Sequence, residues 1–260
     1  MKIALLHLDL SAGPAEKNIE QLLDGIKIAA ANGAQWVITP EMAVQGYFFT
    51  QMNSPVNLKM EIENIIQPIT TLAQKLGIHI FLGCGEYEEK SDNNYNSCLV
   101  IDDNGVIIAR HRKMNVVKSK SEAWSTPGVD YTVVDCHNFK VGVLVCADAW
   151  FSENALALKE REAEIIIVIA AWPPGCGGPP EEAWKRCSNV SGNKPVVVCN
   201  QTGHNNGMDC LVAQSAIILD GEMEFAYNGN PAVVVCEFGQ TEGLVLKQSL
   251  VLEIKEEDYD

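Results

Sequence analysis

The stretch FKVGVLVCADAW, at residues 139–150, and the run IIIVIA, at residues 165–170, decide the fold class. The first is an apolar strand that ends in a tight turn. The second is a continuous β-branched run, which is typical of a strand covered on both faces. Residues 152–164, between them, are predicted to form a short helix. A strand, a helix and a second buried strand in succession favour an α/β fold.

The N-terminal half of the chain has the same alternation. Gly13-Pro14 is expected to open a first helix, which has its apolar residues on one face and ends at Gly33. Pro68 lies inside a second helical pattern, so that helix either begins or kinks there. Asn104-Gly105 is the expected turn of a hairpin. The strands predicted in this half are KIALLHLDL (2–10), WVIT (36–39), IHIFLGCGEY (78–87) and the two arms of the hairpin over 96–115.

The C-terminal part is rich in strands, which follow a helix around Trp184. They are VVVC (196–199), CLVAQSAIIL (210–219), AVVVC (232–236) and LVLKQSLVLEI (244–254). Four clear helices are too few for an eightfold α/β barrel. No linker or composition shift divides the chain, so residues 1–260 are predicted to form a single domain. Helices alternating with buried and antiparallel strands predict mixed sheets covered by helices, which is a layered α/β sandwich.

Composition and charge narrow the possible functions. The 260 residues include 19 Lys and Arg against 34 Asp and Glu, which gives a net charge of −15. Such a charge argues against a nucleic-acid or anionic-membrane partner, because phosphate surfaces require a basic face. No apolar run approaches the length of a membrane span, and no secretory signal is evident. Nine cysteines without a Cys-x-x-Cys pair predict a reduced, cytoplasmic protein.

Three chemically useful side chains share one setting, just beyond an apolar strand. Glu41 follows WVITP, Lys113 follows VIIARHR, and Cys146 follows VGVLV. Ligands of α/β sheets bind outside the carboxyl ends of strands, so the three side chains can converge. A thiol is a strong nucleophile once ionised, a carboxylate can take its proton, and an ammonium can stabilise the thiolate and then an oxyanion.

Each of the three residues also has an ordinary structural interpretation. Cys146 could be one more buried apolar cysteine, Glu41 a solvated turn acid, and Lys113 part of a solvated charge cluster. A metal or redox protein using the nine cysteines is a further alternative, but His204 near Cys199 has no zinc-ligand spacing. A non-catalytic binding protein of the same fold would be expected to lack one of the three side chains. The sequence therefore predicts an enzyme without metal or cofactor.

The strings around these residues resemble the nitrilase superfamily, the carbon–nitrogen hydrolases, in the same order over most of the chain. The matching strings are PEMAVQGY (40–47), RHRKMN (110–115), VGVLVCADAWFSE (141–153), AAWPPG (170–175), WKRCSNVSGNKPVVVCNQTG (184–203) and QSAIILDGE (214–222). The resemblance implies an α-β-β-α sandwich of two mixed sheets flanked by helices. It also implies a homodimer or a higher homo-oligomer. Continuous apolar runs such as 165–170, with few helices to cover them, suggest the same assembly.

Catalytic roles follow from the resemblance, residue by residue. Glu41 would be the general base and acid, Lys113 would stabilise the oxyanion, and Cys146 would be the nucleophile. The backbone N–H of Ala147 would be the second oxyanion donor. Glu122, in KSKSEAWSTPG, matches a second glutamate found in many relatives, which would orient Lys113; its alternative interpretation is a loop acid. Cys146 is also expected to be the one fast-reacting thiol, since the other eight cysteines are expected to lie in apolar runs.

The substrate site is predicted less sharply. Tyr47, Trp150 and Trp172 lie in loops that shape the substrate pocket in relatives, although aromatic residues there could equally be packing. Cys146 is often followed by Tyr or Trp in the family, whereas Ala147 leaves more room. The predicted activity is hydrolysis of a linear amide or an N-carbamoyl compound through a thioester. A nitrile hydrolase or an amide-forming acyltransferase is the alternative.

Overall fold

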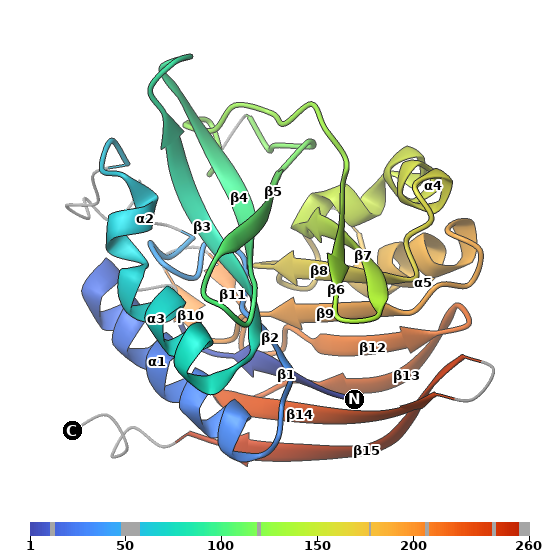
Figure 1. Ribbon diagram of the computed structural model, residues 1–260. Coiled ribbons are helices and arrows are strands. Elements are labelled where there is room, and N and C mark those ends of the chain that lie inside the picture. Colours follow the sequence, from blue (N-terminus) through green and yellow to red (C-terminus); the bar gives the residue numbers. More distant parts are fainter. Residues whose placement is uncertain are drawn as a thin grey trace.

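The structure is a computed structural model that describes residues 1–10, 14–47, 58–118, 121–176, 178–205, 208–240 and 243–254. Gly13, expected to open the first helix, lies outside these ranges. Two β-sheets pack face to face, and helices cover their outer faces (Figure 1). This arrangement is the α-β-β-α sandwich of mixed sheets that the sequence and its resemblance predict.

The first sheet has seven strands in the order β15-β14-β1-β2-β3-β4-β5. Its strands are β1 (Lys2–His7), β2 (Trp36–Ile38), β3 (His79–Glu88), β4 (Asn93–Ile101), β5 (Ile107–Arg112), β14 (Ala232–Gln240) and β15 (Leu244–Glu253). β1, β2 and β3 are parallel, whereas β4 pairs antiparallel with both β3 and β5. β2, β3 and β5 therefore run in the same direction, and their carboxyl ends point to the same edge of the sheet.

The second sheet has six strands in the order β13-β12-β9-β8-β7-β6. They are β6 (Thr132–Cys136), β7 (Phe139–Val145), β8 (Ile165–Ala170), β9 (Val196–Asn200), β12 (Ser215–Leu219) and β13 (Glu222–Tyr227), and a separate ribbon pairs β10 (His204–Asn205) with β11 (Met208–Asp209). β7, β8 and β9 are parallel. The two edge strands, β6 and β13, were not predicted, because both mix polar with apolar residues and are only partly buried.

The helices begin and end close to the expected signals. They are α1 (Ala15–Ala31), α2 (Ile62–Ile65), α3 (Gln67–Leu76), η1 (Cys146–Trp150, a 3₁₀ helix), α4 (Ser152–Glu160) and α5 (Pro180–Val190). Pro68 lies in the first turn of α3, so the second helical pattern is two helices separated at Ile66 rather than one kinked helix. Gly77 ends α3 in the left-handed conformation, with φ of 63°.

Both faces of the first sheet are buried at its central strands, and the alternation of side chains along β1 shows how. Ile3 and Leu5 pack into the core between the two sheets. Ala4 and Leu6 point the other way, into a second core against α1 and α3. Successive residues of a strand face opposite sides, so an uninterrupted apolar run supplies both cores at once.

The central strand β8 needs no second subunit to cover it. All six of its residues are buried within the single chain. The expectation that a partner would cover the run at residues 165–170 is therefore wrong, because helices α4 and α5 and the facing sheet suffice. A homo-oligomer stays a prediction that rests on the family resemblance alone.

Candidate active site

Glu41 lies one turn beyond the carboxyl end of β2 and is fully buried. Its Oε1 accepts hydrogen bonds from Lys113 Nζ (2.7 Å) and Asn96 Nδ2 (2.8 Å). Its Oε2 accepts one from the backbone N–H of Ala171 (3.0 Å), which directly follows β8 in the opposite sheet. The Glu41 side chain thus spans the two sheets and is not a solvated turn acid.

The turn that carries Glu41 depends on a glycine in the neighbouring strand. A Cβ at Gly83 would lie 2.1 Å from the carbonyl oxygen of Pro40 and 3.0 Å from the Cα of Glu41. Gly83 N–H donates to Thr39 Oγ1 (2.9 Å), which fixes the turn against β3. Only glycine allows this close approach, so the apolar strand 79–88 contributes directly to the placement of the carboxylate.

Lys113 and Glu122 complete a buried charge cluster with Glu41. Lys113 directly follows β5, and its ammonium donates to one oxygen of Glu41 and one oxygen of Glu122. Glu122 also accepts from the backbone N–H of Val117 (2.7 Å) and from the hydroxyl of Tyr47 (2.9 Å). All three charged side chains are at most 1% exposed. Glu122 therefore lies at the site and is not a loop acid in solvent.

Asn96 is a member of the cluster that the sequence analysis missed. It lies in β4, is fully buried, and donates its amide N–H₂ to Glu41 (2.8 Å) and to Glu122 (3.4 Å). Its backbone carbonyl accepts from the N–H of Lys113 (2.8 Å). Asn96 is one of three asparagines in β4, so residue type alone does not single it out, and only its complete burial shows that it needs partners.

Cys146 begins η1 at the end of β7 and is 7% exposed. Its φ of 49° is in the left-handed region, which is strained for a non-glycine residue and holds the side chain at a sharp turn between strand and helix. The charges of Glu41, Lys113 and Glu122 all act on its thiol. The residues predicted to converge are therefore brought together.

Asp148 ties the Cys146 turn to the Lys113 segment. Its Oδ1 accepts from the backbone N–H groups of Met114 (3.0 Å) and Asn115 (2.8 Å). Its Oδ2 accepts from the N–H of Val145 (3.1 Å) and lies 3.1 Å from His111 Nε2. A single buried carboxylate thus fixes the strand ends of both sheets relative to each other.

The environment separates the pKa values of the two glutamates. Burial, followed by the charge of Glu122, raises the pKa of Glu41 even though Lys113 lowers it. Burial also opposes ionisation of Glu122, but Lys113 and the hydrogen bonds to its carboxylate bring its pKa below the ordinary value. Burial lowers the pKa of Lys113, yet the surrounding anions outweigh it and the pKa is raised well above normal. Glu122 and Lys113 are thus an ion pair, and Glu41 is the carboxyl group suited to exchange a proton.

Two expectations about the thiols are wrong. Burial, followed by the charge of Glu41, raises the pKa of Cys146 well above its ordinary value, so Lys113 does not hold a thiolate at rest. In addition, Cys176 is exposed in the loop after β8, so the expectation that every other cysteine lies in an apolar run is wrong, whereas the faster reaction of Cys146 stays a prediction. The glycines and prolines around Cys176 place it in a loop rather than a strand.

The four predicted substrate-binding residues do not share one environment. Tyr47 lies at the charge cluster and donates to Glu122. Trp150 and Trp172 pack against each other at 6.1 Å between ring centroids, and Trp172 also contacts Trp184 edge-on, so the packing interpretation accounts for their position. Ala147 follows Cys146 and is half-buried in η1. Its predicted role as an oxyanion donor stays a prediction.

Comparison with known proteins identifies relatives over most of the chain. A curated relative, the citrullinase of Francisella tularensis, is 29% identical over 239 residues, which cover 85% of this chain and 81% of that protein. The N-carbamoylputrescine amidase of Arabidopsis thaliana is 26% identical over 68% of this chain and 61% of its own length. The glutamine-dependent NAD(+) synthetase of Acinetobacter baylyi is 25% identical, and the match spans only 41% of its length.

Solved structures share the fold. An amidase from Nesterenkonia sp. superposes with a TM-score of 0.78 at 20% identity, over 90% of this chain and 89% of that chain. Nit3 of Saccharomyces cerevisiae, a member of the nitrilase superfamily, gives the same TM-score at 21% identity, over 90% and 88% of the two chains.

The family model for carbon–nitrogen hydrolases matches residues 2–224. That range begins with β1 and ends in β13, and it includes Glu41, Lys113 and Cys146. With these matches and the sandwich of two mixed sheets, the chain belongs to the carbon–nitrogen hydrolase family of the nitrilase superfamily.

Proposed function

We propose that this enzyme hydrolyses a linear amide or an N-carbamoyl compound through a thioester on Cys146. The observation that supports this most strongly is the buried cluster of Glu41, Lys113 and Glu122 around a strained cysteine. Burying an ammonium between two carboxylates costs free energy. A role of these groups in proton transfer and oxyanion stabilisation would account for this cost.

In the acylation step, Cys146 Sγ attacks the substrate carbonyl carbon as its proton moves to Glu41. The raised pKa of Glu41 makes this carboxylate a competent acceptor, and the two groups exchange a proton without a histidine. The oxyanion that forms is stabilised by Lys113, with the N–H of Ala147 as the second donor. The C–N bond then breaks, and the departing nitrogen takes the proton from Glu41 and leaves as ammonia or an amine.

In the deacylation step, water attacks the thioester carbonyl and Glu41 takes one of its protons. The C–S bond breaks, and the proton passes from Glu41 to the sulfur, so the thiol of Cys146 is restored and the acid is released. Glu122 stays ionised throughout, because Lys113 and the N–H of Val117 hold its pKa below the ordinary value. It fixes the ammonium and does not exchange protons.

The choice of substrate class is supported by the named relatives. Citrullinase and N-carbamoylputrescine amidase carry names that describe compounds with a carbamoylated nitrogen, and the Nesterenkonia enzyme is an amidase. In a variant of the latter, acrylamide is added to the active-site cysteine. A nitrile hydrolase or an acyltransferase would use the same cysteine, and no feature of the site favours either.

An ammonia-release screen tests the proposal. Amides, ureido acids, N-carbamoyl amines and nitriles are each incubated with the enzyme and with Cys146→Ala, which should release no ammonia. We expect turnover with an amide or N-carbamoyl compound and a thioester adduct by intact mass spectrometry. Turnover of nitriles alone would replace the proposed activity with the nitrilase alternative, and activity that survives in Cys146→Ala would contradict the mechanism.

The variant Glu122→Gln should turn over slowly although it folds. Loss of the charge that orients Lys113 is expected to lower kcat on the order of 10²-fold. The charge of Glu122 also raises the pKa of Glu41, so the acid limb of the kcat/KM profile should move to lower pH. The matched control is Glu88→Gln, which alters a carboxylate bonded to Arg112 outside the cluster (3.0 Å). An unchanged rate and profile in Glu122→Gln would make Glu122 purely structural.

The location and assembly of the enzyme stay predictions. Within the described parts of the chain, no helix is both long enough and apolar enough to cross a membrane. We retain the cytoplasm as the proposed compartment and a homo-oligomer as the proposed assembly.

A further inference from the structure

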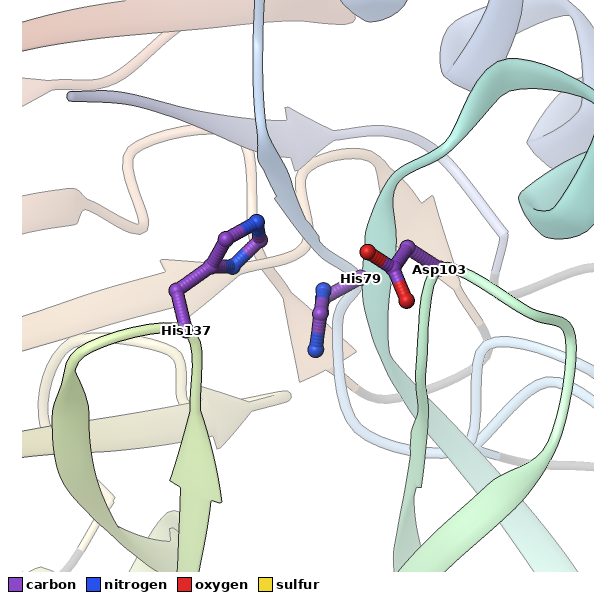
Figure 2. Close-up of side chains that lie close together, drawn as sticks. All are labelled: His79, Asp103 and His137. Atoms are coloured by element: carbon purple, nitrogen blue, oxygen red, sulfur yellow. The ribbon is translucent and has the colours of Figure 1, made fainter.

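A second group of side chains gathers at the opposite end of the sandwich from Cys146. His79 begins β3, Asp103 lies in the turn between β4 and β5, and His137 lies in the turn between β6 and β7. In each residue one potential ligand atom lies within 4.8 Å of the others. Figure 2 shows His79 between the ring of His137 and the carboxylate of Asp103. The three residues come from both sheets of the sandwich.

We propose that His79, Asp103 and His137 bind a divalent transition-metal ion of the zinc class. One nitrogen of His79, Nδ1, has no hydrogen-bond partner in the described chain, although the residue is only 5% exposed. A buried polar atom without a partner is costly, and a metal ion would satisfy it.

The donor set determines the class of metal. Two imidazoles and one carboxylate suit Zn²⁺ and neighbouring first-row ions, whereas Ca²⁺ and Mg²⁺ prefer oxygen ligands. Three protein ligands leave the fourth tetrahedral position to water. Ligand atoms about 2.1 Å from zinc stand about 3.4 Å apart, so the side chains need to close by roughly 1 Å. His137 is exposed and Asp103 partly exposed, which gives the ion a path from solvent.

One hydrogen bond must break for the metal to bind. The indole N–H of Trp36 donates to Nδ1 of His137 at 3.1 Å. A metal bound at Nδ1 would displace Trp36. A metal bound at Nε2 would require the ring proton to move to Nδ1, which could then no longer accept the bond. Either way the environment of the Trp36 indole changes on binding, and this provides a specific spectroscopic signal.

The expected consequence is stability rather than catalysis. At about 3.3 Å per residue, the seven residues of β7 place roughly 20 Å between the His137 turn and Cys146. A metal there cannot touch the reacting atoms, but it joins a strand start of one sheet to a hairpin turn of the other. Because it binds the folded state, a concentration 100-fold above Kd should raise Tm by about 5 °C.

The test uses the full-length protein stripped of metal with a chelator. Titration with ZnCl₂ should show one saturable site, a higher Tm and a shift of the Trp36 indole N–H resonance alone among the five tryptophans. Co²⁺ in place of Zn²⁺ should give a visible spectrum without a thiolate charge-transfer band, which separates this site from binding at Cys146 or Cys176.

Variants of His137 and Asp103, the two ligands that are at least partly exposed, test the site with little risk of unfolding the protein. His137→Gln and Asp103→Asn should each lower affinity at least about 100-fold, since even the loss of a residue that only supports a ligand costs 10–100-fold. His204→Gln, an exposed histidine elsewhere, is the matched control and should bind normally. Absence of a one-equivalent site, or binding that survives both ligand variants, would overturn the proposal. Amidase activity is measured in parallel, so failure of the proposed reaction is seen independently.

Discussion

Glu41→Gln is expected to stop acylation of Cys146 by an amide, with a loss of at least about 10³-fold in the single-turnover rate of thioester formation. Glu41 is the group we assign to take the thiol proton and return it to the departing nitrogen. Glutamine cannot do either. The glutamine amide N–H₂ must also take the place of one carboxylate oxygen. It then faces either the N–H of Ala171 or the two donors at Oε1, and in both cases donors face each other without an acceptor.

The charge and the proton-transfer role of Glu41 can be separated in this variant. The charge of Glu41 raises the pKa of Cys146, so alkylation of Cys146 should begin at a lower pH in Glu41→Gln. An activated ester, whose leaving group needs no proton, should still acylate the variant far better than an amide does. Intact mass spectrometry measures both reactions. If the amide acylates at the normal rate, proton transfer belongs to another group and the assignment of Glu41 fails.

Much of the geometry of the candidate site could be predicted, because the ends of apolar strands can be recognised in the sequence. Glu41, Lys113 and Cys146 each follow an apolar run, and the parallel relation of β2, β3 and β5 brings such ends to one edge. Glu122 could be placed only through the family resemblance. It lies in a segment without regular structure, so no periodicity indicates which way its side chain points.

The residues that were missed contribute through contacts that sequence spacing does not encode. Asn96 bridges two glutamates that lie 55 and 26 positions away in the chain. His79 begins a strand, whereas Asp103 and His137 lie in two separate hairpin turns, so no ligand spacing links them, and the absence of such spacing led to the expectation of no metal. The raised pKa of Cys146 was also not predicted. Burial raises this pKa by more than the charge of Lys113 lowers it, and the extent of burial cannot be read from the sequence.

Lys113→Met is expected to cost most of the activity and much of the stability. It removes the one cation between Glu41 and Glu122, whose side chains are at most 1% exposed. Breaking a buried ion pair in this way typically costs about 3–5 kcal/mol, which corresponds to a drop in Tm of about 10 °C. The double variant Lys113→Met, Glu122→Gln should recover much of the stability but none of the activity, since only one buried carboxyl group then remains.

The effect of Lys113→Met on stability is expected to depend on pH, and the pKa shifts give the sign of that dependence. In the wild type the pKa of Lys113 is raised above its ordinary value of 10.5, so its contribution to stability is complete below that pH and is lost as pH rises further. In Lys113→Met the buried carboxyls attract no cation, so their folded-state pKa values rise above the unfolded value of 4.5. The folded state then binds more protons than the unfolded chain, and stability should fall as pH rises from 4.5 through the raised pKa values. Urea unfolding across this range measures the slope. A Lys113→Met variant as stable as the wild type at neutral pH, with no such slope, would mean that the two glutamates are not held as buried charges.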